Sequence, residues 1–512
     1  MNTTTAPQAN IGPERPIAYF GKQIIIALAG FLVVSLLAAL VVASRWTLVH
    51  DAAVMDYVAF LIRHGFAPYR EIVDLNMPGG ELFPLAQTAI FGSGAAGLLA
   101  WVSIEMVAVI TASIYIAGPH RRWSGFAAGC LISLVHLSYG AWDLGQRDWD
   151  VAVLLLICCA FLVEYLRLGK YPLIAGAFLA GGFAASIKPQ AALFPVIGLL
   201  YVSAARKGNP KITALAALIG FAVPTLVTAL FLEHYHAFGA FLSTGYGLTR
   251  YYASLAHPTL RQLAWDHLHF SEKALVIVCL VGLAFYIKQR LWRWPELNLV
   301  VLGLAFGVAS YYLQNKGFAY HRIPAWTFAS LWLLLVIDAS LTDGNRRTRF
   351  WAWCVVLALM LMCPILLLSE RANRYPLNTI THLQSDLERL GGHSLSGEVQ
   401  CLDMTMGGCV NVLYRLNIKQ STGFIGDFYL FPGEPTPLTS NLQTRFLSEV
   451  SRRPPKVIVL SSHIWPGNRF AYDKVNRWPA FRAYLNSQYR MLDEYDPPGW
   501  PAYAGYRIYL RR

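Results

Sequence analysis

The chain has 512 residues, of which 55% are hydrophobic and 14% are charged, and its formal net charge is +13. A soluble domain carries about 25% charged residues, so much of this protein's surface must face something other than water. The positive charge alone would suit nucleic acid, but the basic residues lie between apolar runs, which is typical of a membrane protein and argues against nucleic acid as a partner.

Beyond a polar segment of residues 1–23, the chain carries about eleven apolar runs of the length that a bilayer-crossing helix needs. The first run is too long for the apolar core of a signal peptide and has no small-residue cleavage site, so we expect it to remain as the first span. We therefore expect residues 24–368 to form a polytopic α-helical membrane domain. The runs are residues 24–43, 94–118, 124–141, 151–166, 171–187, 191–204, 212–232, 274–287, 297–313, 323–338 and 350–368.

Basic residues in alternate linkers indicate the orientation of these spans. They all fall on one side of the membrane if the N-terminus is cytoplasmic, as the positive-inside rule requires. An odd number of spans then leaves residues 369–512 outside the cytoplasm, together with the loops at residues 44–93 and 233–273. The residues that set this orientation are Arg15, Lys22, Arg121, Arg122, Arg167, Lys170, Arg206, Lys211, Lys288, Arg290, Arg346 and Arg347.

The C-terminal segment, residues 369–512, has the pattern of a small soluble α/β domain. Residues 456–461 form a strand-like run, residues 442–451 a helix-like stretch, and Gly- and Pro-rich turns separate such pieces. Cys401 and Cys409 are the two cysteines of this segment. Outside the cytoplasm they can form a disulfide, and two buried thiols are the alternative.

Three short outward loops carry cations on the face where the charge rule leaves few. Each places a cation beside an amide side chain, a combination that suits an anionic group such as a phosphate. The alternative is that these side chains reach for lipid head groups or pair with nearby aspartates. The polar residues of the three loops include Gln146, Arg147 and Asp148, then Lys188, and then Lys316, Tyr320 and His321.

The long first outward loop contains the candidate acids. Asp51 lies nearest to the end of the first span, and Asp56 lies about 140° further round the axis if this stretch is helical, so the two should not face one site. Asp51 could instead cap the helix that follows it. Asp148 and Asp150 form an Asp-x-Asp pair that can hold a divalent cation or simply favour the start of the next helix.

These outward loops resemble those of the GT-C superfamily of membrane glycosyltransferases. The similar group uses polyprenyl-phosphate sugars and includes protein mannosyltransferases and the aminoarabinose transferase of lipid A. The resemblance covers residues 20–340, and Ala52 stands where the group carries a second acid, which leaves that acid's role without a counterpart here. The features that carry it are Asp51, Gly65, residues 77–80, residues 145–148, and Tyr320 with His321.

The resemblance implies an inverting glycosyltransferase at the extracytoplasmic face of a bacterial inner membrane. Asp51 is expected to be the general base that takes the proton of an acceptor hydroxyl, while fixed cations stabilise the departing lipid phosphate. The expected partners are a polyprenyl-phosphate-linked sugar donor, a glycan, lipid or protein acceptor, and membrane lipids. No nucleotide cofactor is expected, and a divalent metal is compatible but not required. The residues expected to bind substrate are Asp56, Arg70, Gln146, Arg147, Asp148, Lys188, Lys316, Tyr320 and His321.

Two other functions compete with this interpretation. A transporter or lipid flippase would typically show internal repeats and polar groups at mid-membrane. The chain has no evident repeat, and Glu105 and Glu164 are the visible mid-span acids. A polymerase or ligase of lipid-linked oligosaccharides would share the same donor chemistry, and the sequence barely separates it from a single-sugar transferase.

Overall fold

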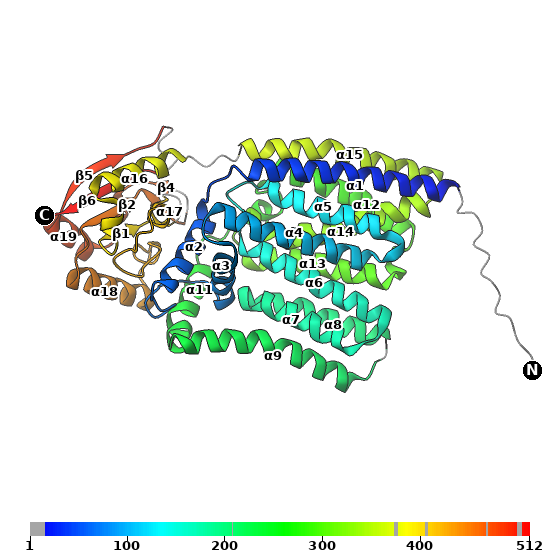
Figure 1. Cartoon of the computed structure of the whole chain (residues 1–512), viewed down its shortest axis with the longest axis horizontal. Coiled ribbons are helices and arrows are strands. Elements are labelled where there is room, and N and C mark those ends of the chain that lie inside the picture. Colours follow the sequence, from blue (N-terminus) through cyan, green and yellow to red (C-terminus); the bar gives the residue numbers. More distant parts are fainter. Residues whose placement is uncertain (1–15, 207, 373–376, 405–407, 467–468, 499–503) are drawn as a thin grey trace, which may run out of the picture.

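The protein consists of a bundle of long helices with an α/β domain at one end (Figure 1). The computed structural model describes residues 16–206, 208–372, 377–404, 408–466, 469–498 and 504–512. Helix α1 begins at the end of the bundle that lies far from the α/β domain, and the chain finishes within that domain.

Each of the eleven expected apolar runs coincides with a helix of the bundle. Seven helical stretches of the described chain are long and apolar enough to cross a membrane by themselves, and they lie in α1, α4, α6, α9, α13, α14 and α15. The bundle helices are α1 (Pro16–Ala43), α4 (Ala95–Ala117), α5 (Arg122–Ser138), α6 (Arg147–Leu168), α7 (Tyr171–Ile187), α8 (Leu193–Arg206), α9 (Pro210–His234), α12 (Phe270–Lys288), α13 (Pro295–Gln314), α14 (Ile323–Thr342) and α15 (Arg346–Ala372).

Helix α14 is the centre of the bundle, and α9 lies on its outside. Nearly every residue of α14 is buried, and the helix packs against α1, α5, α6, α12, α13 and α15. Helix α9 instead exposes Leu215, Leu218, Leu226 and Leu230. A helix that is apolar all round suits a protein core or a lipid surface, and here the two cases occur in one bundle.

Shorter helices lie between the bundle and the α/β domain (Figure 1). The first turn of α3 packs closely against the end of α7. Glycine at position 79 permits this, because a Cβ there would lie 2.6 Å from the carbonyl carbon of Ser186. The elements of this layer are α2 (His50–Arg63), α3 (Pro78–Phe91), α10 (Phe238–Ala240), the π-turn η3 (Phe241–Gly245), α11 (Tyr246–Ala253), the π-turn η4 (Gln262–Asp266) and the 3-10 turn η6 (Ala319–Arg322).

The C-terminal domain contains a four-stranded sheet of order β1-β2-β6-β5, in which only β1 and β2 are parallel. The expected strand and helix are confirmed as β2 and α18. Cys401 and Cys409 form a disulfide, which joins β1 to α17. The strands are β1 (Val399–Leu402), β2 (Val457–Ser461), β3 (His463–Ile464), β4 (Arg469–Phe470), β5 (Tyr489–Tyr495) and β6 (Tyr506–Arg511); the helices are α16 (Leu377–Leu390), α17 (Cys409–Arg415), α18 (Pro437–Arg452) and α19 (Pro479–Gln488).

The C-terminal domain is attached along α2. The Asn411 amide donates to the carbonyl of Leu48 (2.7 Å), and the hydroxyl of Tyr57 donates to the carbonyl of Ile418 (3.0 Å). The hydroxyl of Tyr414 donates to the Asp56 carboxylate (3.0 Å). Since buried hydrogen bonds of this kind fix geometry, the domain and the helix that carries Asp51 form one unit.

Candidate functional site

Asp51 lies at the end of the bundle that adjoins the α/β domain, in the first turn of α2. The helix begins at His50 and Val49 precedes it, so the alternative that Asp51 caps the helix is wrong. The Asp51 carboxylate accepts a hydrogen bond from the side-chain amide of Gln146 (3.1 Å), which precedes α6. The other carboxylate oxygen of Asp51 lies 3.7 Å from His50 Nδ1, and the Asp51 side chain is 18% exposed, so an acceptor hydroxyl can reach it.

The loop before α6 adds an acid that sequence analysis missed. Asp143 is buried, and its burial, followed by the negative charge of Asp51, raises its pKa to about 8. Asp143 is therefore mainly protonated at neutral pH. In the same loop Trp142 stacks on the His50 ring with centroids 4.0 Å apart, and burial lowers the pKa of His50. His50, Trp142 and Asp143 thus form one cluster with Asp51.

Lys188 is held by the first turn of α6 and the last residue of α13. Its ammonium donates to both carboxylate oxygens of Asp148 (2.7 Å each) and to the side-chain carbonyl of Gln314 (2.5 Å). Burial lowers the pKa of Lys188, and the charge of Asp148 opposes that effect. These hydrogen bonds bring the three expected polar loops together. The Lys188 charge is therefore already neutralised by Asp148 rather than left for a ligand.

Lys316 is also occupied by the protein's own groups. Its ammonium donates to the backbone carbonyls of Ala253 (3.0 Å) and Leu255, and it lies 5.3 Å from the centroid of the Tyr252 ring. Burial lowers the pKa of Lys316 to about 8. Lys316 thus fixes the loop after α11 over the site.

Arg147 differs from the other cations. In the part of the chain that the structure describes, its guanidinium has neither an ion pair nor a hydrogen-bond acceptor. Its charge lowers the pKa of Asp74, which burial raises, so the two lie close together. A Cβ at Gly80 would lie 3.2 Å from the Cδ of Arg147, so this glycine leaves room for the arginine. Five guanidinium donors therefore face a site where an anion can bind.

Tyr320 and His321 lie in η6, beside the same site. Both are buried, and their rings meet edge to face with centroids 4.6 Å apart. Among the described residues, His321 Nδ1 has no hydrogen-bond partner. The next residue, Arg322, pairs instead with Glu272 at 2.7 Å. His321 thus offers a buried ring nitrogen that a substrate can satisfy.

Three of the expected residues lie apart from this group. Asp56 accepts from Tyr414 and from the backbone of Gly94, and the side chain of Arg70 is exposed at the surface. Asp150 lies against Glu105, whereas Asp148 holds Lys188, so Asp148 and Asp150 do not converge as a pair of metal ligands. Within the described ranges, no group of three or more His, Cys, Asp or Glu residues could hold a metal ion.

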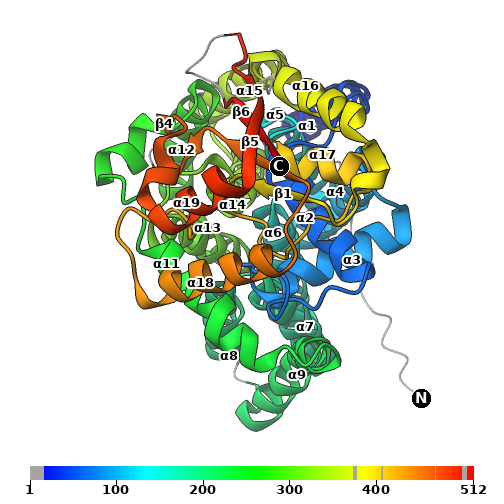
Figure 2. The same cartoon turned by 90° about the vertical axis from the view of Figure 1, so that its left-hand side faces the viewer.

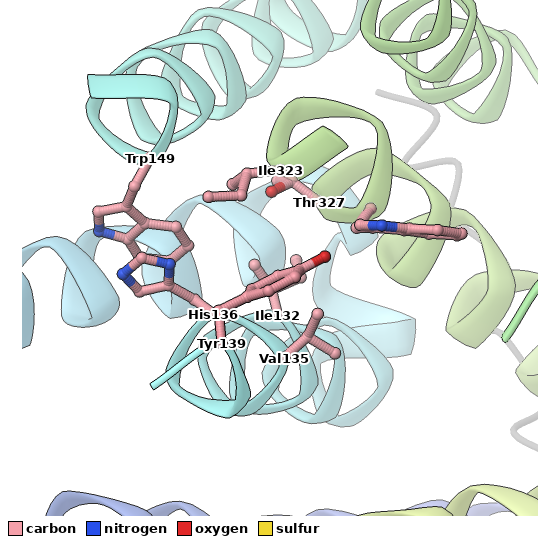
Figure 3. A pocket seen from close by; sticks show the side chains of 8 residues that line it. Ile132, Val135, His136, Tyr139, Trp149, Ile323 and Thr327 are labelled. Atoms are coloured by element: carbon pink, nitrogen blue, oxygen red, sulfur yellow. The ribbon is translucent and has the colours of Figure 1, made fainter. Parts of the chain in front are cut away.

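A small cavity of about 10 Å³ lies between α5, α6 and α14 (Figure 3). His136 stacks on Trp149 there with centroids 4.0 Å apart, and neither ring nitrogen of His136 has a partner among the described residues. A space of this size holds about one water molecule and no substrate.

A larger apolar groove of about 380 Å³ opens between α12, α13 and α14. Its wall is formed by aliphatic and aromatic side chains such as Leu280, Val308 and Trp332, and the buried Arg322 is among the lining residues. The groove therefore runs along the bundle toward the loop that carries Lys316 and His321. Its length and apolar walls suit a hydrocarbon chain.

The comparison with solved structures shows the GT-C fold. The chain superimposes on ArnT from Cupriavidus metallidurans with a TM-score of 0.57 for the apo state and 0.55 for the form bound to undecaprenyl phosphate. The identity is 12%, and the alignments cover 93% of this chain and 97% of ArnT. The oligosaccharyltransferase of Archaeoglobus fulgidus has a TM-score of 0.57 at 12% identity, with 94% of this chain and 80% of that one covered.

No protein-family model matches the sequence, and the search of curated proteins finds no match. The fold is therefore supported by the three-dimensional arrangement of helices and C-terminal domain. At 12% identity, the neighbours establish the architecture and leave the reaction to be argued from the site.

Proposed function

We propose that this protein is an inverting glycosyltransferase that moves a sugar from a polyprenyl-phosphate carrier to an acceptor hydroxyl. The observation that carries the proposal is that Gln146 holds Asp51, while the next residue, Arg147, has a guanidinium with no hydrogen-bond acceptor among the described residues. One group can take a proton and the other can bind a phosphate. The GT-C fold, with ArnT bound to undecaprenyl phosphate among the solved structures, supports the lipid carrier.

The proposed reaction is a single displacement. The acceptor oxygen attacks the anomeric carbon while its proton passes to the Asp51 carboxylate, and the bond between that carbon and the phosphate oxygen breaks. The bonding electrons leave with the polyprenyl phosphate, whose negative charge Arg147 stabilises, with His321 as a further contact. Attack from the side opposite the leaving group inverts the anomeric configuration.

The apolar groove between α12, α13 and α14 is the proposed place for the polyprenyl chain. Arg322, the residue after His321, is among its lining residues, so a lipid in the groove can bring its phosphate to the end of the bundle that carries His321. A lipid head at this depth lies beside Lys316 and His321 rather than at mid-membrane. The burial of a long apolar chain supplies binding energy that the small polar head lacks.

The site is proposed to face the extracytoplasmic side of a bacterial inner membrane. The basic loops gather at the opposite end: Arg121 lies over Trp294 and pairs with Asp338, and Arg167 pairs with Glu296. Such a basic end is typical of the cytoplasmic face. The disulfide of the C-terminal domain also suits an oxidising compartment.

The test uses purified protein with a polyprenyl-phosphate-linked sugar, and mass spectrometry measures the release of polyprenyl phosphate. Asp51→Asn keeps the hydrogen bond to Gln146 but cannot take a proton, so we expect transfer to fall about 10²- to 10⁴-fold with donor affinity unchanged. Asp56→Asn, in the same helix but bonded to Tyr414, is the matched control and should stay active. An Asp51→Asn variant as active as the wild type would remove Asp51 from the mechanism.

The mass gained by the acceptor separates the proposed reaction from the transfer of a whole glycan. The likeness to the archaeal oligosaccharyltransferase, as high in TM-score as that to apo ArnT, makes that second reaction the specific alternative. A gain of one sugar residue supports single-sugar transfer. A gain of several residues in one step supports an oligosaccharide transferase, and transport of the donor without any transfer would support a flippase.

A further inference from the structure

The carboxyl ends of β1 and β2 face the candidate active site. These strands are parallel, so the chain leaves both at the same edge of the sheet. Asp403 follows β1 directly, and its charge acts on His50, the neighbour of Asp51. Figure 2 shows this domain in front of the bundle, with β1 and α17 over α2. In open sheets, ligands bind beyond the carboxyl ends of parallel strands.

Trp465 lies just beyond this edge and forms a stacked pair with the membrane domain. Its indole packs on the ring of Tyr252, near the end of α11, with centroids 4.8 Å apart and an angle of 5° between the planes. Phe428 meets both rings edge on, at 5.6 Å from Trp465 and 6.0 Å from Tyr252. Trp465 stays partly exposed, and its indole N–H has no acceptor within the described residues.

Tyr252 connects this pair to the reacting groups. Burial raises the pKa of its hydroxyl, the charge of Asp51 raises it further, and that of Arg147 lowers it, which places the hydroxyl near both. The Lys316 ammonium lies 5.3 Å from the centroid of the same ring. Tyr252 therefore contacts Trp465 directly and lies within the electrostatic reach of Asp51 and Arg147.

A single displacement requires the leaving phosphate and the attacking hydroxyl to lie on opposite sides of the anomeric carbon. The apolar groove along α12 to α14 brings the lipid phosphate from the bundle, so the attacking hydroxyl must enter from the opposite side of the anomeric carbon. That side is the C-terminal domain, where the stacked pair lies. A flat aromatic surface with a free N–H donor suits a pyranose, which has an apolar C–H face and a rim of hydroxyls.

We propose that Trp465 and Tyr252 form the acceptor subsite and that it binds a sugar ring, so that the acceptor is a glycan. The role of this subsite as the acceptor site rests on the proposed sugar transfer. The binding of a sugar ring, however, can be measured whether or not the protein transfers sugars. The C-terminal domain thereby selects the substrate that the membrane domain glycosylates.

The test measures sugar binding by the full chain in lipid nanodiscs through saturation-transfer NMR. The probes are the methyl β-glycosides of glucose, galactose, mannose and N-acetylglucosamine, with sorbitol as an acyclic polyol that lacks a flat C–H face. We expect at least one glycoside, but not sorbitol, to receive saturation at its ring C–H protons. Trp465→Ala should weaken that binding about tenfold or more, whereas Trp465→Phe should retain most of it.

Trp351→Ala is the control, because Trp351 is an exposed tryptophan of α15 and lies outside the site. Unchanged thermal unfolding of Trp465→Phe shows that the subsite is tested in a folded protein. The proposal is overturned if no glycoside binds, if sorbitol binds as well as the glycosides, or if Trp465→Ala binds them like the wild type. Preferential binding of an alanine-rich peptide at Trp465 would indicate a protein acceptor and overturn it too.

The two proposals fail separately in this experiment. Asp51→Asn should bind the glycosides normally, since Asp51 takes no part in stacking. Trp465-dependent binding without any release of polyprenyl phosphate would leave a sugar subsite in a protein of another activity. Release of polyprenyl phosphate without Trp465-dependent binding would leave the transferase and remove the glycan acceptor.

Discussion

At the scale of single residues, most cationic side chains of the site are already paired with groups of the protein itself. Asp148 holds Lys188, Glu272 holds Arg322, and backbone carbonyls hold Lys316. A buried pair of this kind fixes geometry more than it attracts a ligand, because each charge is already satisfied. Arg147 has no such partner among the described residues, and an anion bound there would be its main electrostatic partner.

Arg147 is therefore predicted to contribute most of the phosphate stabilisation. Arg147→Ala should lower kcat/KM for the donor about 10²- to 10³-fold, the usual effect of removing one stabilising donor. Arg147→Lys should recover only part of it, since an ammonium cannot make the two parallel hydrogen bonds of a guanidinium. Steady-state release of polyprenyl phosphate measures both. The exposed Arg469, in β4, provides Arg469→Ala as control, and equal losses in the two alanine variants would contradict the role of Arg147.

Asp143 is predicted to make the stability of the protein depend on pH. Its pKa is raised from 3.8 to about 8, so the folded chain holds an extra proton across this window. The free energy of unfolding must then fall as pH rises from about 4 to about 8. Asp143→Asn removes this contribution, so its Tm relative to the wild type should be several degrees higher at pH 8 than at pH 5.

Thermal unfolding at several pH values measures this difference, with Asp493→Asn on the exposed strand β5 as control. Parallel Tm curves for the wild type and Asp143→Asn would contradict the buried protonated acid.

The sequence could predict only those site residues that stand out as polar groups in the loops between apolar runs. Asp51, Gln146 and Arg147 stood out because they are polar residues at the ends of apolar runs. Asp143 has the same setting, but nothing local marks a carboxyl that folding buries. Trp465 lay beyond prediction, because its partner Tyr252 is more than two hundred residues away and stacking leaves no local pattern.

At the scale of elements, the disulfide between Cys401 and Cys409 connects the sheet to α17, the helix that contacts the α2 region. Cys401 lies in β1 and Cys409 begins α17, whose Asn411 and Tyr414 bond to the α2 region. The backbone N–H of Cys409 also donates to Asp403 (3.1 Å). The disulfide therefore links the sheet edge to the helix that contacts the α2 region.

Removing this disulfide should loosen the C-terminal domain. The loop is short, with a sequence separation of 8, so the chain-entropy model gives a loss of roughly 2–3 kcal/mol. Cys401→Ala with Cys409→Ala should lower Tm, and transfer should weaken because α17 supports α2. Differential scanning fluorimetry measures the change, with the free Cys354→Ala as control. Maleimide labelling of both thiols in protein isolated without reductant would contradict the bond.

Hydropathy predicted the bundle well, since each apolar run became a helix. It did not predict the exact ends: α15 extends to Ala372, beyond the expected boundary at residue 368, and α6 begins at Arg147. Helix ends depend on capping and tertiary contacts, which a run of apolar residues does not encode. Of the layer formed by α2, α3 and α11, only the stretch after Asp51 was considered as a helix, because these half-buried helices lack the continuous hydrophobicity of a span.

At the scale of the whole molecule, the two ends of the bundle have different chemistry. One end carries the basic loops, and the other carries Asp51, Arg147 and the C-terminal domain (Figure 1). This polarity is what a transferase needs when its lipid-linked donor enters from the membrane and its acceptor from the aqueous side. A transporter would require a polar path from both ends, whereas Asp51, Arg147 and Lys188 gather at one.

The most direct measurement of sugar transfer by this protein is mass spectrometry of the cell-envelope glycans. Cells that lack the gene are compared with cells that carry the wild type, Asp51→Asn or Asp56→Asn. We predict that one glycan loses a sugar in the deletion, that the wild type and Asp56→Asn restore it, and that Asp51→Asn does not. Unchanged glycans in the deletion, or full restoration by Asp51→Asn, would contradict the proposed transferase.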